Sequence, residues 1–434
     1  MTVADNSLQR ALQVLDVPED FNAYETTDDS ELVVRLEQWR QKAYGVLAEL
    51  RQQLQDREEL ALEEKVAVVA AVAQFSGGGA WATESTHALA EETLKPYANG
   101  DVQLVEAILN ECVRPIFRSN LHPKVNASTG RVLPRSAGGT SAYQDHYEGQ
   151  VWKRHPGVLN VIDWCVTCIE GTAYERIWHL VIPPIMTLLD DYETKYKLRG
   201  VQIVSHLLEN APGELLRRTG IGGLFYSSFK TCLTFLRTAE TPALIRSVVP
   251  ASLLLVEKTT LPASTERFDQ LWGVLGEGII DTVWTYGFEE AESVRATLDV
   301  LPDVIRALGI GCSRYLKALV LQLVHPLVPG PENPDTAFQL ASVCALVVLM
   351  EECAPRMQKW KGTILDGVCR RWVNLVESGV ADEYDARALK KALRDTCEVL
   401  ARVCPSVAKE EYCRLLELDE QMFRPLVALG ADEA

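Results

Sequence analysis

Apolar residues along this chain recur at intervals of three and four residues and seldom alternate with polar ones. After the capping cluster Asp28-Asp29-Ser30, this spacing runs from Leu32 to Leu54, and it returns between Leu389 and Cys404 near the other end. Intervals of three and four place apolar side chains on one face of an α-helix, whereas strict alternation would indicate a strand. The pattern therefore predicts an all-α protein with long amphipathic helices.

Prolines divide the helical pattern into units of similar length. Three helix endings resemble one another, and each is followed by a proline: Pro212, Pro355 and Pro405. The first two lie 143 residues apart, close to three units of about 48, and the last two lie 50 residues apart. This period is near that of HEAT and armadillo units. We expect an α-solenoid of HEAT/armadillo-like helical repeats, with about seven to nine helix pairs; a multi-helix globule with prolines in its loops is the alternative.

A second set of prolines marks another position in each unit. Pro183-Pro184, Pro250 and Pro302 stand near the start of apolar helical runs. Proline is tolerated in the first turn of a helix, where its missing N–H leaves no hydrogen bond unmade. We therefore expect these prolines at helix starts.

The composition along the chain suggests three regions. Residues 119–150 are rich in Gly, Ser, Thr and Asn and show little periodicity, so we expect a flexible loop or insertion there. An acidic helical region, 1–118, precedes this loop, and the repeat array, 151–434, follows it.

Charge and cysteine content limit the classes of function. The chain has 434 residues and a net charge of −17, which disfavours a nucleic-acid or acidic-membrane partner. Its most apolar segment, Leu340 to Met350, is too short to span a bilayer, and no leader segment is recognisable. Eleven scattered cysteines indicate reduced thiols rather than a disulfide framework. We expect a cytoplasmic and nuclear protein.

Candidate catalytic groups are few, and each has a structural interpretation. Cys165 and Cys168 form a Cys-x-x-Cys within an amphipathic run, where core packing is the favoured interpretation over redox or zinc chemistry. The adjacent Asp190 and Asp191 point in different directions on a helix, and we expect one of them to pair with Arg199. We predict no catalytic, cofactor-binding or metal-ligating residue.

One conspicuous segment runs from Ile182 to Glu193 and continues in Lys197-Leu198-Arg199-Gly200-Val201 and His206-Leu207-Leu208. It resembles the hallmark of the Tel-two-interacting protein two family, the smaller HEAT-repeat subunit of the Triple-T complex. Further matches lie at Leu301 to Ile310 with Arg314 to Lys317 and, more weakly, at Glu257 to Thr259. The resemblance spans roughly residues 160–410, and the first 150 residues carry no matching motif.

The resemblance implies a non-enzymatic scaffold and cochaperone. Members of the family bind Tel-two-interacting protein one directly. With Tel-two, the heat-shock chaperone and the R2TP machinery, they support maturation of the phosphatidylinositol-3-kinase-related kinases, which links them to telomeres, DNA-damage checkpoints and TOR signalling. The resemblance implies no cofactor, nucleic acid or membrane.

Two sets of residues follow from this interpretation. The motif residues that we expect to hold the scaffold's shape are Pro183, Pro184, Asp190, Asp191, Leu198, Arg199 and Gly200. Gly200 would let two helices approach closely, while Leu198, Val201 and Leu208 would face the core. Partner-facing candidates are Arg217, Arg218 and Tyr226, since Tyr and Arg often anchor interfaces; a plain solvated surface is the alternative.

Two other classes of function remain open at this point. Transport receptors and trafficking adaptors are also acidic helical solenoids. An all-α enzyme would use Cys165 and Cys168, or the Asp190-Asp191 pair.

Overall fold

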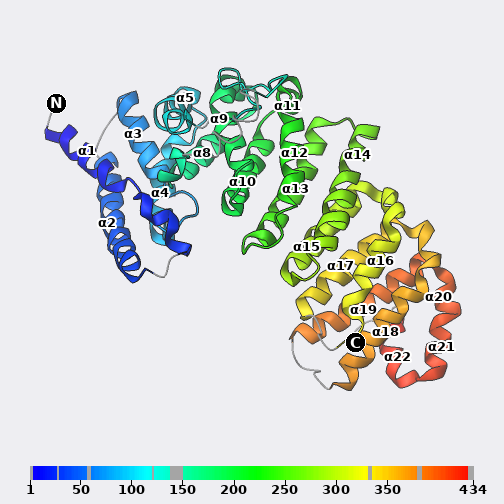
Figure 1. Ribbon diagram of the computed structural model, residues 1–434. Helices are drawn as coiled ribbons and strands as arrows, with labels where there is room; N and C mark the ends of the chain where they lie inside the picture. Colours follow the sequence, from blue (N-terminus) through cyan, green and yellow to red (C-terminus); the bar gives the residue numbers. More distant parts are fainter. Residues whose placement is uncertain are drawn as a thin grey trace. The chain divides into compact units, whose positions relative to one another are not determined.

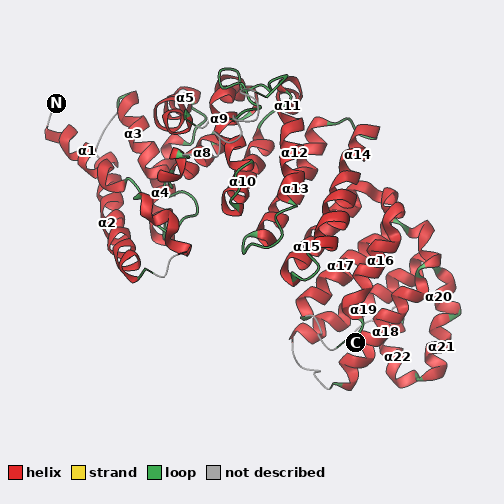
Figure 2. Ribbon diagram, viewed as in Figure 1, coloured by secondary structure: helices red, strands yellow, loops and turns green. Residues whose placement is uncertain are grey.

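The computed structural model describes residues 3–26, 29–55, 60–119, 122–136, 150–330, 335–378 and 384–428. Within these ranges the regular secondary structure is helical (Figure 2). The β-type contact found there is an isolated antiparallel bridge between Val125 and Val132. The predicted all-α class is confirmed.

The chain forms two compact units, Met1–Phe229 and Lys230–Ala434. The boundary falls inside one helix, α12 (Ile221–Cys232). The expected division into 1–118, 119–150 and 151–434 concerns which residues form repeats. The compactness of the two units does not test it, so this division stays a prediction.

The first unit combines α-helices (Figure 1) with several 3-10 and π segments, which are named η here. Its described elements are α1 (Val3–Leu15), η1 (Glu19–Thr26), α2 (Ser30–Gln55), α3 (Leu62–Ala73), α4 (Glu84–Leu94), η2 (Lys95–Tyr97), α5 (Val102–Ile108), η3 (Leu109–Val113), α6 (Arg114–Phe117), η4 (Val151–Arg154), α8 (Val158–Thr167), η5 (Gly171–Ala173), α9 (Tyr174–Leu189), α10 (Thr194–Asn210) and α11 (Gly213–Thr219). Here α3 packs on α5 and α8, and α10 packs on α8 and α9.

The second unit is also helical. Its described elements are α13 (Thr241–Thr259), α14 (Thr265–Gly273), η6 (Val274–Trp284), α15 (Ala291–Leu308), η7 (Gly309–Tyr315), α16 (Leu316–Val324), η8 (His325–Leu327), α17 (Thr336–Glu352), η9 (Ala354–Lys359), α18 (Lys361–Glu377), α19 (Tyr384–Val403), α20 (Pro405–Lys409), α21 (Glu411–Leu418) and α22 (Glu420–Val427).

Alternate helices of the second unit form a continuous layer. Helix α13 packs on α15, α15 on α17, and α17 on α19, while α16 packs on α18 in a second row (Figure 1). Helix pairs that contact mainly their neighbours are the defining feature of a helical solenoid. The predicted α-solenoid class is therefore confirmed, and the HEAT/armadillo type stays a prediction from the spacing.

Local sequence signals explain several helix boundaries. Asp29 Oδ1 accepts hydrogen bonds from the N–H groups of Glu31 and Leu32 at the start of α2, and Leu32 and Leu36 are buried along its apolar face. Helix α10 ends at Asn210, α17 at Glu352 and α19 at Val403. Each ending lies one to three residues before the expected proline, so this set of predictions is confirmed.

The second set of prolines does not lie at helix starts. Pro183 and Pro184 lie inside α9, Pro250 inside α13, and Pro302 inside α15. Each removes one N–H from the helical ladder, at a cost of about 3 kcal/mol. Each of these helices has an extensive buried face, so tertiary packing outweighs the local penalty. The prediction of first-turn prolines is wrong for this reason.

Part of the expected loop 119–150 lies within the described residues. The Val132 N–H donates to the carbonyl of Thr219 (3.1 Å), and Trp178 Nε1 donates to the carbonyl of Gly130 (3.1 Å). The segment 122–136 thus contacts α9 and the end of α11. Residues 137–149 lie outside the described residues, and the flexibility of the loop stays a prediction.

One helical stretch of the described residues, Ala291–Leu327, is long and apolar enough by length and composition to cross a membrane. It comprises α15, η7, α16 and η8. Leu301, Val304 and Ile305 of α15 are buried, and this helix packs on α13 and α17. The buried share of its apolar window is 33%, so packing within the layer of helices accounts for only part of the apolar character of the stretch.

Candidate functional site

The conspicuous motif of the sequence forms a helix, a turn and a second helix. Its first part lies in α9, residues 190–193 form the turn, and α10 carries the rest. Asp190 caps the end of α9, where its N–H donates to the carbonyl of Met186. The turn thereby places two neighbouring carboxylates in different surroundings.

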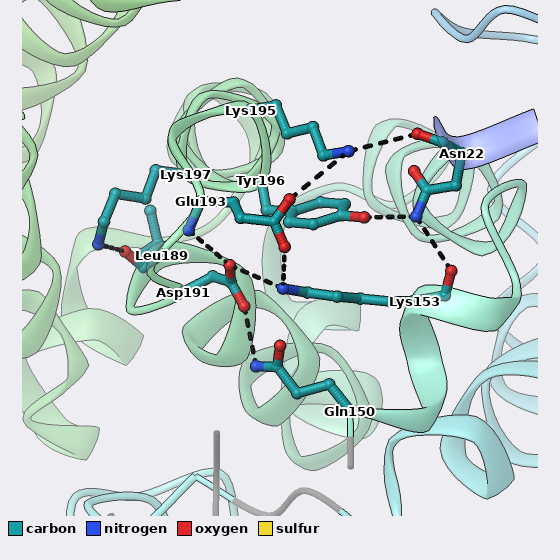
Figure 3. Close-up of polar contacts among 9 residues, drawn as sticks. All are labelled: Asn22, Gln150, Lys153, Leu189, Asp191, Glu193, Lys195, Tyr196 and Lys197. Carbon is teal, nitrogen blue, oxygen red and sulfur yellow. Dashed lines mark hydrogen bonds and ion pairs between the residues drawn. The ribbon is translucent and has the colours of Figure 1, made fainter. Parts of the chain in front are cut away.

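Asp191 lies at the centre of a polar cluster (Figure 3). Its side chain is fully buried, and Lys153 Nζ of η4 lies 3.1 Å from its Oδ1. Gln150 Nε2 donates to Oδ2 (2.8 Å), and the N–H of Glu193 donates to Oδ1 (2.8 Å). A buried carboxylate with no such partners would cost several kcal/mol, so these contacts are what allow Asp191 to be buried.

Lys153 connects this cluster to aromatic side chains. Its Nζ lies 2.5 Å from Glu193 Oε1, and 4.2 Å and 4.6 Å from the ring centroids of Tyr192 and Tyr196. Burial would raise the pKa of Glu193, but the hydrogen bond and charge of Lys153 hold that pKa below its ordinary value. The ammonium group is therefore held by two carboxylates and by aromatic faces.

The same cluster fixes a segment near the start of the chain. Asn22 of η1 donates through Nδ2 to the carbonyl of Lys153 (3.1 Å) and to Tyr196 Oη (2.5 Å), while Lys195 Nζ donates to the Asn22 carbonyl (3.3 Å) (Figure 3). Burial raises the pKa of Tyr196, so its hydroxyl stays protonated. Residues more than 130 positions apart are thus joined around the motif turn.

Asp190 forms a separate set of contacts on the other side of the turn. Its carboxylate binds His122 Nε2 at 2.9 Å and Ser228 Oγ at 2.7 Å. Burial would raise the pKa of Asp190, but the hydrogen bonds from His122 and Ser228 outweigh burial and lower that pKa. This carboxylate therefore ties α12 and the segment around residue 122 to the end of α9.

The expected pairing of Arg199 with Asp190 or Asp191 is wrong. Arg199 Nη2 instead lies 3.0 Å from Asp163 Oδ2 on α8 and 2.8 Å from Asn160 Oδ1. The Asn160 amide in turn donates to the carbonyls of Gln74 (2.8 Å) and Gly78 (3.1 Å). The reason for the error is geometric: Arg199 lies on the face of α10 that meets α8, whereas the aspartates lie at the turn before α10.

Gly200 lies at a close contact between α9 and α10. A Cβ atom at this position would lie 3.0 Å from both Leu188 Cβ and the backbone nitrogen of Leu189. The close approach expected at Gly200 is therefore present. Val201 and Leu208 are buried as expected, whereas Leu198 is only half-buried.

Lys197 occupies a core position that sequence reasoning missed. It is only 2% exposed, and its Nζ donates to the carbonyl of Leu189 (2.8 Å) at the end of α9. A cation at the carboxyl end of a helix is favoured by the free carbonyls and the helix dipole. The contact accounts for a lysine on the buried face of α10.

Pro183 and Pro184 line a cavity of about 630 Å³ in the first unit. Other lining residues include Asn110 of η3, Arg114 of α6 and Arg118, which follows α6. Because a proline lacks an N–H, the carbonyls of His179 and Leu180, four residues earlier, lose their usual helical donors. The paired prolines thus shape this surface as well as the helix itself.

Cys165 and Cys168 are not in a form ready to react. Cys165 is fully buried, and burial raises its pKa well above the ordinary value; burial likewise raises the pKa of Cys168 to about 12. A thiol reacts as its thiolate, so both cysteines are protonated at neutral pH. Across the described ranges, no group of three or more His, Cys, Asp or Glu side chains is placed to hold a metal ion.

The partner-facing candidates lie on the surface of the first unit, near the end of α11 and in α12. Arg217 and Arg218 are exposed, and they pair with Glu214 (2.7 Å) and Glu175 (2.9 Å). Tyr226 is half-buried. Their role in binding stays a prediction.

A family model described as the Tti2 family matches residues 68–334 of this chain. The chain belongs to the Tti2 family. The resemblance inferred from the motifs is thereby confirmed, although its limits differ. The family match begins at residue 68 and ends at residue 334, whereas the motifs span roughly residues 160–410. The hydrogen bonds of Asn160 with Gln74 and Gly78 join the motif helices to this earlier part of the match.

Tti2-family relatives from mammals match about half of the chain. TELO2-interacting protein 2 of Rattus norvegicus is 28% identical over 224 residues, which cover 49% of this chain and 41% of the rat protein. The proteins of the same name from Mus musculus and Homo sapiens are 27% and 24% identical over 214 and 218 residues. The matches cover 41% of the mouse protein and 40% of the human one, well under two thirds of these relatives' lengths.

A solved structure of an engineered protein aligns with 96% of this chain and 92% of its own, at 13% identity and a TM-score of 0.36. A TM-score this low does not define a shared fold.

The residues that complete the motif cluster were not predicted. Asn22, His122, Lys153, Asn160 and Asp163 lie 30 or more positions from their motif partners. Polar residues of these types are common on helix surfaces and in loops, and nothing in their local spacing marks them as buried. Among these residues, the sequence indicates burial only for Asp163, which lies beside Trp164 in an apolar run.

Proposed function

We propose that this protein is a non-enzymatic scaffold subunit of a Triple-T-type complex. In this proposal it binds Tel-two-interacting protein one directly, associates with Tel-two, and supports the folding and assembly of phosphatidylinositol-3-kinase-related kinases. The observation that carries the proposal is membership of the Tti2 family, together with relatives named for their interaction with TELO2.

The internal contacts of the motif support a scaffold role. Asp190, Asp191 and Arg199 are each engaged by partners from other elements, so their charges stabilise the stack of helices and are not presented to a substrate. Stacked helices expose long surfaces to protein partners and need no cofactor. The heat-shock chaperone and the R2TP machinery are the further proposed partners, with the cytoplasm and nucleus as the proposed location.

Reconstitution tests the proposed complex. The full chain, carrying an affinity tag, is coexpressed with Tel-two and Tel-two-interacting protein one of the same organism and purified by size exclusion with light scattering. We expect a stable complex containing one copy of each protein. Failure of either protein to co-purify would contradict the proposal, and recovery of transport factors from native extract in their place would favour a transport receptor.

Depletion of the protein tests the proposed role in kinase maturation. We expect rapid depletion to lower the steady-state amounts of several phosphatidylinositol-3-kinase-related kinases while their transcripts stay constant. Re-expression of the wild-type chain should restore them. Unchanged kinase amounts after complete depletion would refute the maturation role, even if the complex itself forms.

A further inference from the structure

A groove on the Lys230–Ala434 unit is lined by four basic side chains and no acidic one. It has a volume of about 740 Å³ and lies where η7 meets α16 and η9 meets α18. The four basic residues are Arg314, Lys317, Arg356 and Lys359. We call this surface the basic groove.

The cations of the basic groove lack carboxylate partners. Elsewhere in the same unit, Arg306 pairs with Asp303 at 2.9 Å, and Lys361 pairs with Glu411 at 2.7 Å. None of the four groove cations forms an ion pair with a carboxylate among the residues that the structure describes. In a chain with a net charge of −17, four unpaired cations in one groove form a local region of positive potential.

Aromatic rings hold two of these cations in place. The guanidinium carbon of Arg314 lies 5.0 Å from the ring centroid of Trp272, and Lys359 Nζ lies 5.7 Å from that of Trp360. A cation over an aromatic face is oriented by the ring and keeps its full charge. The groove is therefore partly preorganised for an anionic ligand, which reduces the entropy lost on binding.

The N-terminus of α18 adds to the positive potential. Helix α18 begins at Lys361, and no side chain forms a hydrogen bond at its cap, Trp360. The first N–H groups of a helix lack helical partners and carry a partial positive charge. Since Trp360 lines the groove, this helix start lies at its wall.

We propose that the basic groove docks a short acidic segment of a partner protein. The carboxylates of that segment would pair with Arg314, Lys317, Arg356 and Lys359, and its backbone would lie over Trp360. The four cations are exposed rather than enclosed, and the groove volume is in the range that accommodates several residues. A long nucleic acid is disfavoured because it would extend over a chain with a strong negative charge, whereas a short segment meets only the local field within the screening length of about 8 Å.

The inference goes beyond the proposed function, because it concerns a surface and a ligand chemistry that do not depend on the identity of the Triple-T partners. Binding can be measured with the full chain alone. The probe is a fluorescein-labelled peptide of about ten Asp and Glu residues, with a Ser/Gln peptide of equal length as control. We expect saturable binding of the acidic peptide by fluorescence anisotropy and a steep loss of affinity with added salt.

Charge reversal in the groove identifies the site. The double variant Arg356→Glu/Lys359→Glu should bind the acidic peptide at least roughly tenfold more weakly than wild type. A matched control is Lys391→Glu/Arg394→Glu, because these two exposed cations also lie three residues apart in the same unit without an ion pair within the described ranges. The single variant Lys317→Ala provides a milder change if the double variant unfolds.

The outcomes separate the alternatives. Loss of binding in the groove variants, with normal binding in the control, supports the proposal. Equal affinity of wild type and both groove variants would overturn it. Binding of a phosphopeptide of equal charge, in the absence of binding by the Asp/Glu peptide, would show that the occupant is a phosphate group and that the proposed carboxylate segment is wrong.

Discussion

Arg199 on α10 and Asp163 on α8 form an ion pair with a nitrogen–oxygen distance of 3.0 Å. The same guanidinium nitrogen donates to Asn160, whose amide reaches the carbonyls of Gln74 and Gly78. One arginine therefore joins α10, α8 and the segment after α3. The helices of the first unit are held in register by this network as well as by apolar packing.

Replacement of Arg199 by glutamate should destabilise the first unit and weaken partner capture. The new carboxylate would lie beside Asp163, and both side chains are less than one fifth exposed. Loss of one partner of a largely buried pair costs about 3–5 kcal/mol, which corresponds to a fall of roughly 6–20 °C in the unfolding midpoint of a unit this size. Differential scanning calorimetry and pull-down of Tel-two-interacting protein one measure the two effects.

The control for this variant is Arg246→Glu in the second unit. Arg246 also forms an ion pair between helices, with Asp299 at 2.8 Å, but both side chains are more than one third exposed. Exposed pairs contribute about 0–1 kcal/mol, so the unfolding midpoint should change by only a few degrees. Normal thermal stability together with normal pull-down for Arg199→Glu would refute the role assigned to Arg199.

Gly200→Ala should also destabilise the first unit. The added methyl group would lie 3.0 Å from the backbone nitrogen of Leu189, which cannot move without shifting α9. We expect the free energy of unfolding to fall by about 1–3 kcal/mol, which is typical of overpacking.

Gly223→Ala in α12 is the matched control. An added Cβ there meets no atom within 4 Å, and the helix should gain up to about 1 kcal/mol of stability. In urea unfolding, the free energy of unfolding should fall for Gly200→Ala and rise for Gly223→Ala. Equal stability of the two variants would contradict the close contact at Gly200.

His206 should make the stability of the protein depend on pH above about 6.5. Its Nδ1 lies 2.6 Å from Asp163 Oδ1, and this hydrogen bond raises the pKa of His206 above 6.5. Burial lowers this pKa, the negative charge of Glu209 raises it, and the positive charge of Arg199 lowers it. Because the pKa of His206 is higher in the folded than in the unfolded state, the charged histidine stabilises the fold. This stabilisation is complete below pH 6.5 and is lost as the pH rises through the pKa of the folded state.

The variant His206→Gln isolates this contribution. The difference in unfolding midpoint between wild type and His206→Gln should be larger at pH 6 than at pH 8. A constant gap between wild type and His206→Gln across this range would show that the pair with Asp163 does not involve a charged histidine.

Helix positions could be predicted because their signal is local. The apolar residues Leu389, Leu393 and Leu400 follow the helical period and are all buried in α19. Asp101, which follows Gly100, caps α5 through hydrogen bonds to two backbone N–H groups, as its position after a helix terminator predicts. The prolines inside α9, α13 and α15 could not be placed correctly, because only tertiary packing decides whether a helix continues through a proline.

The polar contacts of the site could be predicted only in part. The sequence marks Asp190, Asp191 and Arg199 as unusual, and all three are engaged in contacts between elements. Their partners could not be assigned, because Lys153 and Asp163 come from elements 36 to 38 residues away and carry no periodic signal of burial. Close packing of helices, not sequence proximity, determines which charges meet.

Replacement of Arg217 and Arg218 together by glutamate tests the predicted partner surface. Each arginine is exposed and paired with a glutamate, so the free energy of unfolding should fall by less than about 1 kcal/mol. If these side chains anchor the interface, the affinity for Tel-two-interacting protein one should fall at least roughly tenfold. Arg306→Glu is the control for local pairing, because Arg306 also pairs with an acidic residue three positions earlier on its own helix. Affinity by surface plasmon resonance and the unfolding midpoint separate binding from folding. Retention of the complex by the double variant, at wild-type affinity and stability, would show that the two arginines belong to ordinary solvated surface and that the partner binds elsewhere.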